Sequence, residues 1–128
     1  MVLDSSALIC LILAGPGHPE LKARMLSAPL LTIGAPTLAE TALVLTARLK
    51  RDARPVLNEF LREAEVEVVP FDRNHFDVAV DAFLRYGKGR HPAALNFGDC
   101  LTYATARVAG MPLLYTGKDF PRTDLSRR

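Results

Sequence analysis

The chain has 128 residues, of which 49% are hydrophobic and 23% are charged, and this is the composition of an ordinary globular protein rather than a disordered one. We expect one domain over residues 1–128, long enough to fold without disulfides or a structural metal. The 16 basic and 14 acidic residues nearly balance at a formal net charge of +2, so the total charge does not indicate a nucleic-acid partner.

The chain begins MVLDSSALICLILAG, and its apolar run resembles a secretion signal or a membrane anchor. A secretion signal carries basic residues before its apolar core, whereas the only charged side chain in residues 1–6 is that of Asp4. A membrane-spanning helix needs about 20 apolar residues, and this run is much shorter. We therefore expect a strand over 1–3, a turn at Asp4, a buried helix over 5–14, and a cytoplasmic protein without a membrane anchor.

Strand and helix patterns alternate along the rest of the chain. Short apolar runs bounded by Pro or Gly predict strands, and apolar residues spaced three or four apart predict helices. The predicted helices are 18–28, 36–50, 53–65, 72–86 and 98–109, and the predicted strands are 30–33, 66–69 and 112–115, with an edge strand near Leu125. The side chains expected to face the core from helix 72–86 are Phe76, Ala79, Val80 and Phe83.

The predicted strands are nearly continuous apolar runs, and they alternate with helices. This pattern is typical of a parallel sheet that is covered by helices on both faces. We therefore expect an α/β protein, a three-layer α/β/α sandwich with a central, mostly parallel sheet of four to five strands.

The two cysteines, Cys10 and Cys100, lie far apart in apolar segments. Their number allows one disulfide, but their apolar surroundings favour buried free thiols in a reducing compartment. The spacing of cysteine and histidine does not match a zinc site. The three histidines, His18, His75 and His91, are expected at the surface.

Four acidic residues stand outside the polar surface patterns: Asp4, Glu40, Asp99 and Asp119. Each also fits a structural role. Asp4 and Asp99 fit as helix caps, Glu40 fits a capping box with Thr37, and Asp119 fits a turn. However, all four occur where strands end or helices begin, and in a parallel α/β sheet these ends share one edge, at which ligands bind.

Carboxylates crowded at one edge repel each other, and they persist together only when a cation neutralises them or protons bind. Carboxylate oxygens suit hard ions such as Mg²⁺ or Mn²⁺, which activate water and bind a phosphoryl oxygen. No Cys–His or Ser–His nucleophile pair is evident in the sequence. The acidic residues therefore predict a metal-dependent phosphodiester hydrolase.

Four motifs occur in order along the chain. They are Asp-Ser-Ser-Ala-Leu at 4–8, Thr-Leu-Ala-Glu at 37–40, Leu-Asn-Phe-Gly-Asp-Cys with Tyr-Ala over 95–104, and Leu-Leu-Tyr, Gly-Lys-Asp-Phe and Thr-Asp-Leu over 113–125. Together they resemble the PIN-domain nucleases, and specifically the VapC-type toxins of bacterial toxin–antitoxin pairs. The segment 96–104 is the most specific part, and the resemblance covers essentially the whole chain.

This resemblance implies a PIN-like fold and an Mg²⁺- or Mn²⁺-dependent endoribonuclease toxin. Such an enzyme hydrolyses RNA phosphodiesters with a metal-activated water and leaves 5′-phosphate and 3′-hydroxyl ends. The implied catalytic and metal-binding residues are Asp4, Glu40, Asp99 and Asp119. Asp4 and Asp99 would be the most direct ligands, while the other two would bind through water, hold a second ion or orient the attacking water.

Three further residues take expected roles from the resemblance. Ser6 would hydrogen-bond a carboxylate or the substrate, although it also fits an ordinary first-turn position of a helix. Asn96 would help to order the site. Lys118 departs from the family, in which this position is often acidic or an amide, and it is expected either to pair with Asp119 or to contact phosphate.

Basic residues close to the acids are expected to bind RNA phosphates, which would make binding sensitive to salt. The expected RNA contacts are Arg85, Lys88, Arg90 and Lys118. A second basic cluster ends the helix 36–50 and consists of Arg48, Lys50, Arg51 and Arg54. It has two interpretations, an interaction with the helix dipole or a contact with RNA.

The resemblance also implies a cognate small antitoxin of the VapB type and a homodimer. We expect an Arg or Lys of the antitoxin to enter the carboxylate cluster as an ion-pair substitute for metal. The apolar helices in the first half of the chain are the expected surfaces for the antitoxin and for a second copy.

Two other functions fit parts of the sequence. A catalytically inactive PIN-fold module that binds RNA or protein would share the fold, but the four intact acids argue against it. A receiver domain requires neighbouring acids after the first strand, where this chain has Ser5 and Ser6. The metal-dependent ribonuclease is therefore the prediction.

Overall fold

Four short parallel strands form the centre of the molecule in the computed structural model, which describes residues 1–127, with side chains to residue 125. They are β1 (Val2–Leu3), β2 (Leu31–Gly34), β3 (Val66–Val69) and β4 (Leu113–Leu114), in the order β3-β2-β1-β4. Val2 lies opposite Thr32 on one side and Leu113 on the other. Because the chain builds outward from β1 to β3 and then returns to the far side of β1, the strand order reverses at β1.

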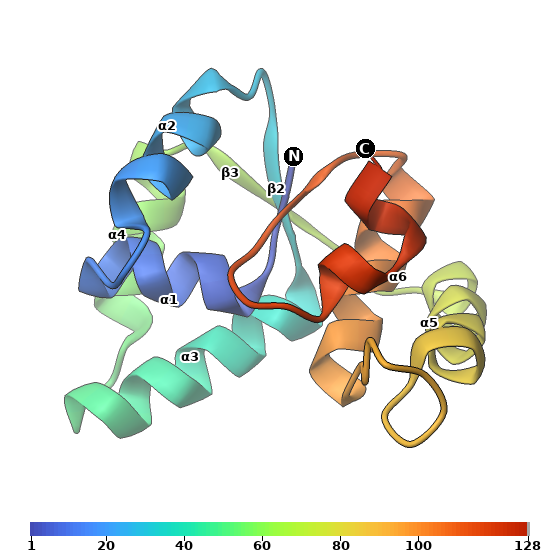
Figure 1. Cartoon of the computed structure of the whole chain (residues 1–128). Coiled ribbons are helices and arrows are strands. Elements are labelled where there is room, and N and C mark those ends of the chain that lie inside the picture. The colour runs from blue at the N-terminus through green and yellow to red at the C-terminus, as the bar shows by residue number, and fades with distance from the viewer. Residues whose placement is uncertain (128) are drawn as a thin grey trace.

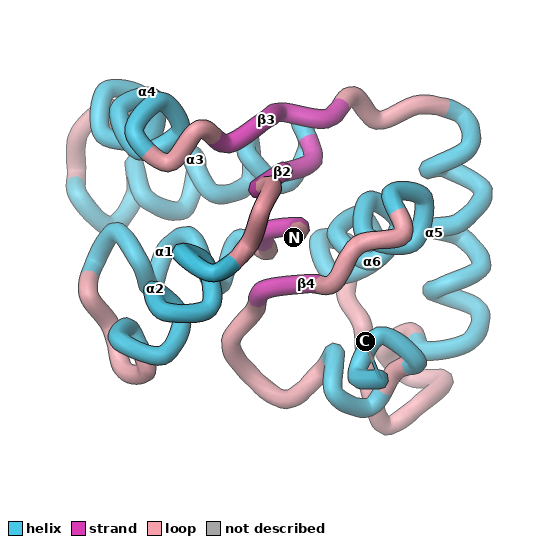
Figure 2. Tube along the Cα trace, turned by 90° about the horizontal axis from the view of Figure 1, so that it is seen from above, coloured by secondary structure: helices cyan, strands magenta, loops and turns pink. Residues whose placement is uncertain are grey.

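Helices cover both faces of this sheet, as the view in Figure 2 shows. One face carries α1 (Ser5–Leu13), α2 (His18–Ser27), α3 (Ala35–Leu49) and α4 (Arg54–Glu63), and the other carries α5 (Arg73–Tyr86) and α6 (Phe97–Ala109). Two short 3₁₀ helices, η1 (Phe120–Arg122) and η2 (Asp124–Arg127), end the described chain. The predicted three-layer α/β/α sandwich with a parallel sheet is confirmed.

Strand side chains alternate between two apolar cores. Leu3, Ile33 and Leu114 are buried in the core shared with α1 to α4. Val2 and Leu113 are buried in the core shared with α5 and α6. Because successive strand residues point to opposite faces, even a two-residue strand such as β1 binds both helical layers to the sheet.

The apolar run near the N-terminus is helix α1. Its residues Ala7, Leu8 and Leu11 are buried in the core under α1 to α4. Among residues 1–127, no helix combines the length and the hydropathy that crossing a membrane requires. The strand-turn-helix interpretation of the first 15 residues is therefore confirmed.

The expected edge strand near Leu125 is wrong, because this segment forms η2 and the sheet has four strands. Local hydrogen bonds satisfy its backbone: Thr123 N–H donates to Phe120 O at 3.0 Å, and Leu125 N–H donates to Thr123 Oγ1 at 3.2 Å. The side chains of Phe120 and Leu125 are buried against the core of α5 and α6. The C-terminal segment thus packs on a helical layer instead of extending the sheet.

Helix α5 turns a different face to the core from the one that its apolar pattern predicts. Its buried residues are His75, Ala79, Ala82 and Tyr86. Only Ala79 of the expected set is among them, since Phe76, Val80 and Phe83 are 55%, 45% and 41% exposed. Small residues allow α5 to approach α6 closely, which leaves its large apolar residues outside the contact.

The two cysteines are buried and free, as predicted. His18 and His91 are partly exposed, but the expected surface position of His75 is wrong. His75 is buried because its ring belongs to the capping box at the start of α5, in which Asp72 N–H donates to His75 Nδ1 at 3.2 Å. A local capping role therefore accounts for this histidine.

Gly34, the last residue of β2, lies against α6. A Cβ added there would stand 2.7 Å from Thr105 Oγ1, and Thr105 is buried. Because overpacking of a closed interior costs about 1–3 kcal/mol, we expect Gly34→Ala to lower the free energy of unfolding by this amount in urea denaturation. Gly15→Ala is the control, since a Cβ there would meet its neighbours at an ordinary 3.5 Å. Equal stability of the two variants would contradict the close packing of β2 on α6.

Candidate functional site

Asp4 stands at the carboxyl end of β1, where the strand order reverses, and it is the N-cap of α1. Figure 1 shows the chain running from its N-terminus into α1. Its backbone N–H donates to Leu114 O at 2.9 Å, which fixes it beside β4. The residue is only 4% exposed, and both carboxylate oxygens accept hydrogen bonds. Thr102 Oγ1 donates to Oδ1 at 2.8 Å, while Ser6 donates to Oδ2 from its backbone N at 3.1 Å and from Oγ at 2.5 Å. The carboxylate is thus held in one orientation at the edge where ligands bind.

Ser6 links this carboxylate to the segment that follows β4. Its Oγ accepts a hydrogen bond from the backbone N–H of Thr116 at 3.0 Å while it donates to Asp4. Ser6 is also a first-turn residue of α1, so both roles expected for it occur together. The exit of β4 and the start of α1 are therefore held together by one hydroxyl group.

Asp99 lies in the first turn of α6, where it forms a capping box with Asn96. Asn96 Oδ1 accepts from Asp99 N–H at 2.9 Å, and Asp99 Oδ2 accepts from Asn96 N–H at 3.1 Å. The N-cap is therefore Asn96 and not Asp99, which occupies the third helical position. This reciprocal pair holds the Asp99 side chain at the helix N-terminus, and it gives Asn96 an ordering role.

Glu40 reaches from α3 to the start of α6. A Cβ added at Gly98 would collide with Glu40 Oε2, so only glycine allows the carboxylate to approach this closely. The capping box expected between Thr37 and Glu40 does not form, because the N-cap of α3 is Gly34 and Thr37 is the third residue of the helix. Thr37 Oγ1 instead lies 3.2 Å from Thr102 Oγ1 on α6.

The four predicted acids share one electrostatic environment, and we call Asp4, Glu40, Asp99 and Asp119 the acid cluster. Burial raises the pKa of Asp99 to about 6, and the charges of the three other acids add to this increase. The hydrogen bond with Asn96 opposes it. As the side chains lie, no three acidic, histidine or cysteine groups within the described residues are close enough to hold a metal ion.

Asp119 is exposed and directly precedes η1. The pairing of Lys118 with Asp119 that the sequence suggests does not form, because neither residue belongs to an ion pair within the part of the chain whose side chains are described. Lys118 is exposed in the same loop. The loop after β4 therefore carries one acidic and one basic side chain that are open to solvent.

Two of the expected RNA-binding side chains pack on aromatic rings. Arg85 donates to the Tyr86 hydroxyl at 2.8 Å and lies 4.8 Å from the centre of its ring, and Arg90 lies 5.5 Å from the centre of the Phe83 ring. Lys88 is exposed in the loop between α5 and α6. The expected contacts of Arg85, Lys88 and Arg90 with RNA stay predictions.

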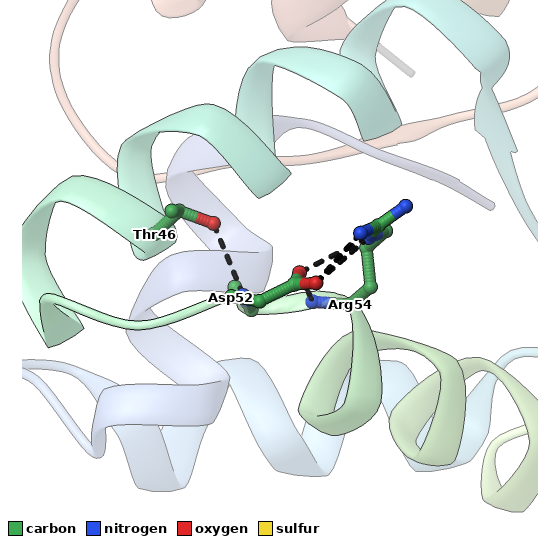
Figure 3. A network of polar contacts seen from close by, with 4 residues as sticks. Thr46, Asp52 and Arg54 are labelled. Carbon is green, nitrogen blue, oxygen red and sulfur yellow. Dashed lines mark hydrogen bonds and ion pairs between the residues drawn. The ribbon is translucent and has the colours of Figure 1, made fainter.

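The basic cluster at the end of α3 divides into residues with different surroundings. Arg54 forms an ion pair with Asp52 at 2.7 Å, and its hydrogen bonds lower the pKa of Asp52 to about 2. Figure 3 shows this pair beside Thr46, which accepts a hydrogen bond from the turn. Arg48 instead lines a groove of about 570 Å³ with Ser6, Ile9, Leu13 and Thr116. Arg48 therefore shares a groove with Ser6, whose hydroxyl group hydrogen-bonds Asp4.

Sequence reasoning did not identify Thr102, Thr37, Gly98 and Thr116 as parts of the site. Two of them could have been identified from their spacing to a predicted acid. Thr102 follows Asp99 by one helical turn, and Thr37 precedes Glu40 by one turn. Residues three apart share a helix face, so each threonine lies on the side of its acid.

Comparisons with known proteins identify the family of this chain. The PIN domain family model matches residues 1–125. Ribonuclease VapC36 of Mycobacterium tuberculosis is 46% identical over 129 residues, which cover 100% of this chain and 93% of the relative. The chain belongs to the PIN-domain family and, within it, to the VapC ribonucleases. A ribonuclease VapC of Mycolicibacterium smegmatis is 39% identical over 98% of each chain.

Solved structures show the same fold. The VapC20 toxin of Mycobacterium tuberculosis, described as cleaving the sarcin-ricin loop, superposes with a TM-score of 0.72 at 21% identity and covers 98% of this chain and 92% of its own. A toxin–antitoxin complex from Klebsiella pneumoniae gives a TM-score of 0.68 at 18% identity, with coverages of 97% and 92%. The family resemblance that the four motifs predict is confirmed, and the sandwich is a PIN fold.

The raised pKa of Asp99 predicts how this VapC ribonuclease responds to pH without metal. The folded protein keeps the Asp99 proton up to about pH 6, whereas an unfolded chain releases it near pH 4. Stability is therefore fully present below that range and falls as the pH rises from 4 to 7. We expect Asp99→Asn to be more stable than the parent by about 1–2 kcal/mol at pH 7, because it removes this ionisation.

Thermal unfolding in EDTA between pH 4.5 and pH 7.5 measures this difference. Asp77→Asn, which changes an exposed acid on α5, is the control and should follow the parent. The same pH dependence in the parent and in Asp99→Asn would contradict the raised pKa of Asp99.

Proposed function

We propose that this VapC ribonuclease requires Mg²⁺ or Mn²⁺ and hydrolyses RNA phosphodiesters by attack of water, leaving 5′-phosphate and 3′-hydroxyl ends. The acid cluster at the carboxyl edge of the sheet is the observation that carries the proposal. Four segments distant in sequence contribute its members. Burial raises the pKa of Asp99, and the charges of the other three acids add to the increase. Such an excess of negative charge suits a bound cation.

The donor set fits a hard divalent ion, because all four side chains offer carboxylate oxygens. Asp4 and Asp99 would be its direct ligands. Glu40 and Asp119 would bind it through water, hold a second ion or orient the attacking water. Since the side chains are too far apart to enclose an ion as they lie, they would move together on binding. When bound, the ion lowers the pKa of water and stabilises charge on the phosphoryl oxygens.

The residues around the acids have separate tasks in this proposal. Ser6 and Thr102 hold the Asp4 carboxylate in place. Asn96 holds Asp99 through the capping box. The absence of a side chain at Gly98 leaves room for Glu40 beside the start of α6. The protein thus positions the acids before RNA arrives, which favours catalysis by reducing reorganisation during the reaction.

RNA would lie across the acid cluster, with basic side chains on its phosphates. Arg85, Lys88, Arg90 and Lys118 stay predicted contacts. We add Arg48, because it lines the groove that also contains Ser6 and Thr116. Such contacts would make RNA binding weaken as salt concentration rises.

Replacement of a direct ligand tests the proposed reaction. We expect Asp4→Asn or Asp99→Asn to reduce the rate of RNA cleavage in Mg²⁺ or Mn²⁺ by about 10²–10⁴-fold, because each loses a charge on which metal binding and water activation depend. End-labelled RNA resolved on denaturing gels measures the rate and the end groups. Asp77→Asn is the matched control and should cleave like the parent.

Undiminished cleavage in both acid variants would contradict the assignment of the site. The alternative function, a catalytically inactive RNA- or protein-binding module, makes a different prediction. In that case calorimetry would detect RNA binding by the parent but no uptake of Mn²⁺.

We propose a small VapB-type antitoxin as the cognate protein partner. One of the neighbouring folds was determined in a toxin–antitoxin complex. An antitoxin Arg or Lys would pair with the acid cluster in place of the metal, because a guanidinium or ammonium group forms strong hydrogen bonds with carboxylates. A toxin that cleaves cellular RNA would act in the cytoplasm.

An apolar groove of about 600 Å³ supports the proposed homodimer. It is lined by Pro36, Phe71, Phe76, Ala79, Val80, Phe83, Phe97, Cys100 and Leu101. This lining contains no charged residue, and Phe97 is 80% exposed. It belongs mainly to α5 and α6, so the proposed surface differs from the helices of the first half that the sequence suggested. A second copy would cover these side chains, as apolar faces of this kind are covered in stable dimers.

Two substitutions test this surface. We expect Phe76→Ser combined with Phe97→Ser to shift sedimentation velocity profiles from dimer to monomer, because both remove apolar area from the groove. Leu26→Ser on α2 is the control, since Leu26 is 70% exposed and lies outside the groove. A monomeric parent, or a double variant that stays dimeric, would contradict this surface.

A further inference from the structure

Two buried threonine hydroxyls lie behind the acid cluster. Thr102 on α6 is 0% exposed and Thr37 on α3 is 2% exposed. Thr102 Oγ1 lies 2.8 Å from Asp4 Oδ1 and 3.2 Å from Thr37 Oγ1. The three groups therefore form a continuous polar chain through the interior, from α3 through α6 to the end of β1.

The direction of these hydrogen bonds follows from their chemistry. A carboxylate oxygen only accepts, so Thr102 gives its single proton to Asp4. Thr37 must then donate to Thr102, because Thr102 has no second proton to offer. We call this ordered chain the threonine relay. Aligned hydroxyl groups polarise one another where the surroundings exclude water, which strengthens both hydrogen bonds.

The relay joins the elements that carry three of the four acids. Thr37 precedes Glu40 by one turn of α3, and Thr102 follows Asp99 by one turn of α6. The hydrogen bond between the threonines thus links the helices of Glu40 and Asp99, and the one to Asp4 links both helices to the sheet. A shift of either helix would stretch one of these bonds.

We propose that the threonine relay sets the positions of Asp4, Glu40 and Asp99 for the metal ion, and that Thr102 is a positioning residue for the reaction. This inference rests on the proposed function. Acids at one edge repel each other, and something must hold them together before a cation binds. Neutral hydroxyl donors do this without a positive charge that would compete with the metal, as an Arg or Lys in the same place would. They leave a second lone pair on Asp4 Oδ1 for other contacts.

Two substitutions of Thr102 separate the hydroxyl from the methyl group. Thr102→Val keeps the shape and removes the hydroxyl, whereas Thr102→Ser keeps the hydroxyl and removes the methyl group. We expect Thr102→Val to weaken Mn²⁺ binding by about 10–100-fold in isothermal titration calorimetry, the usual effect of losing a partner that orients a metal ligand. Thr102→Ser should bind Mn²⁺ within about threefold of the parent, because the hydrogen bond to Asp4 remains.

RNA cleavage supplies a second measurement. In Thr102→Val we expect kcat to fall at limiting Mn²⁺ and to recover largely as Mn²⁺ is raised, with little change in KM for RNA. A merely structural role would not produce recovery by metal. Thr37→Val removes the first donor but leaves the bond from Thr102 to Asp4, so its loss of Mn²⁺ affinity should be smaller, below about 10-fold.

Thr105→Val is the matched control on the same helix. Thr105 is buried like Thr102, but its Oγ1 donates to the backbone oxygen of Leu101 at 3.0 Å. Its substitution also removes a buried hydroxyl, and Mn²⁺ affinity should stay at the parent value. Thermal unfolding in EDTA shows which variants fold. If Thr102→Val does not fold, the Mn²⁺ affinity of Thr37→Val tests the proposal instead.

Three results would overturn the relay: Thr102→Val binding Mn²⁺ as tightly as the parent, Thr102→Ser losing as much affinity as Thr102→Val, or Thr105→Val losing affinity equally. These results leave the proposed function intact, provided that the parent binds Mn²⁺ and cleaves RNA. A parent that does neither would overturn the proposed function and, with it, the relay.

Discussion

The molecule depends on one buried carboxylate at the edge of its sheet. Asp4 ends the central strand β1, caps α1 and accepts hydrogen bonds from Ser6 and Thr102, while its backbone N–H binds Leu114. Ser6 belongs to α1, Thr102 to α6 and Leu114 to β4, so Asp4 joins three elements to the end of β1. A carboxylate withdrawn from water needs such donors, because unsatisfied burial of this group is very costly. The same contacts that make its burial acceptable also assemble the site.

Charge repulsion is the second constraint, and it opposes the first. Burial raises the pKa of Asp99, and the charges of three other acids add to this increase, so negative charge is crowded around Asp99. Hydroxyl and backbone donors hold Asp4 and Asp99 without neutralising them. The proposed cation would relieve this repulsion and draw the acids together, which is the electrostatic arrangement that phosphodiester hydrolysis by a metal-activated water requires.

Helix α5 shows what an apolar pattern leaves open. Its large residues Phe76, Val80 and Phe83 form a clear stripe, yet the protein buries the face with Ala79 and Ala82 instead. A periodic pattern says that a face avoids water, but it does not say which neighbour covers it. The face with small residues packs against α6, because small side chains permit the two helices to approach closely. The exposed stripe joins Phe97 in the apolar groove proposed as the dimer surface.

The sequence by itself determined the parallel α/β architecture, the family and the four acids, because strand periodicity, turn residues and motif order are local properties. It also placed Asp4, Asp99 and Asp119 near the ends of elements, from which the fold rule brings them to one edge, while Glu40 lies in the second turn of α3. Only the tertiary structure decided how they are held. Thr37 and Thr102 are 65 positions apart, and Thr102 is 98 positions from Asp4. A hydrogen bond between such distant residues depends on how helices pack, and no local pattern encodes that packing.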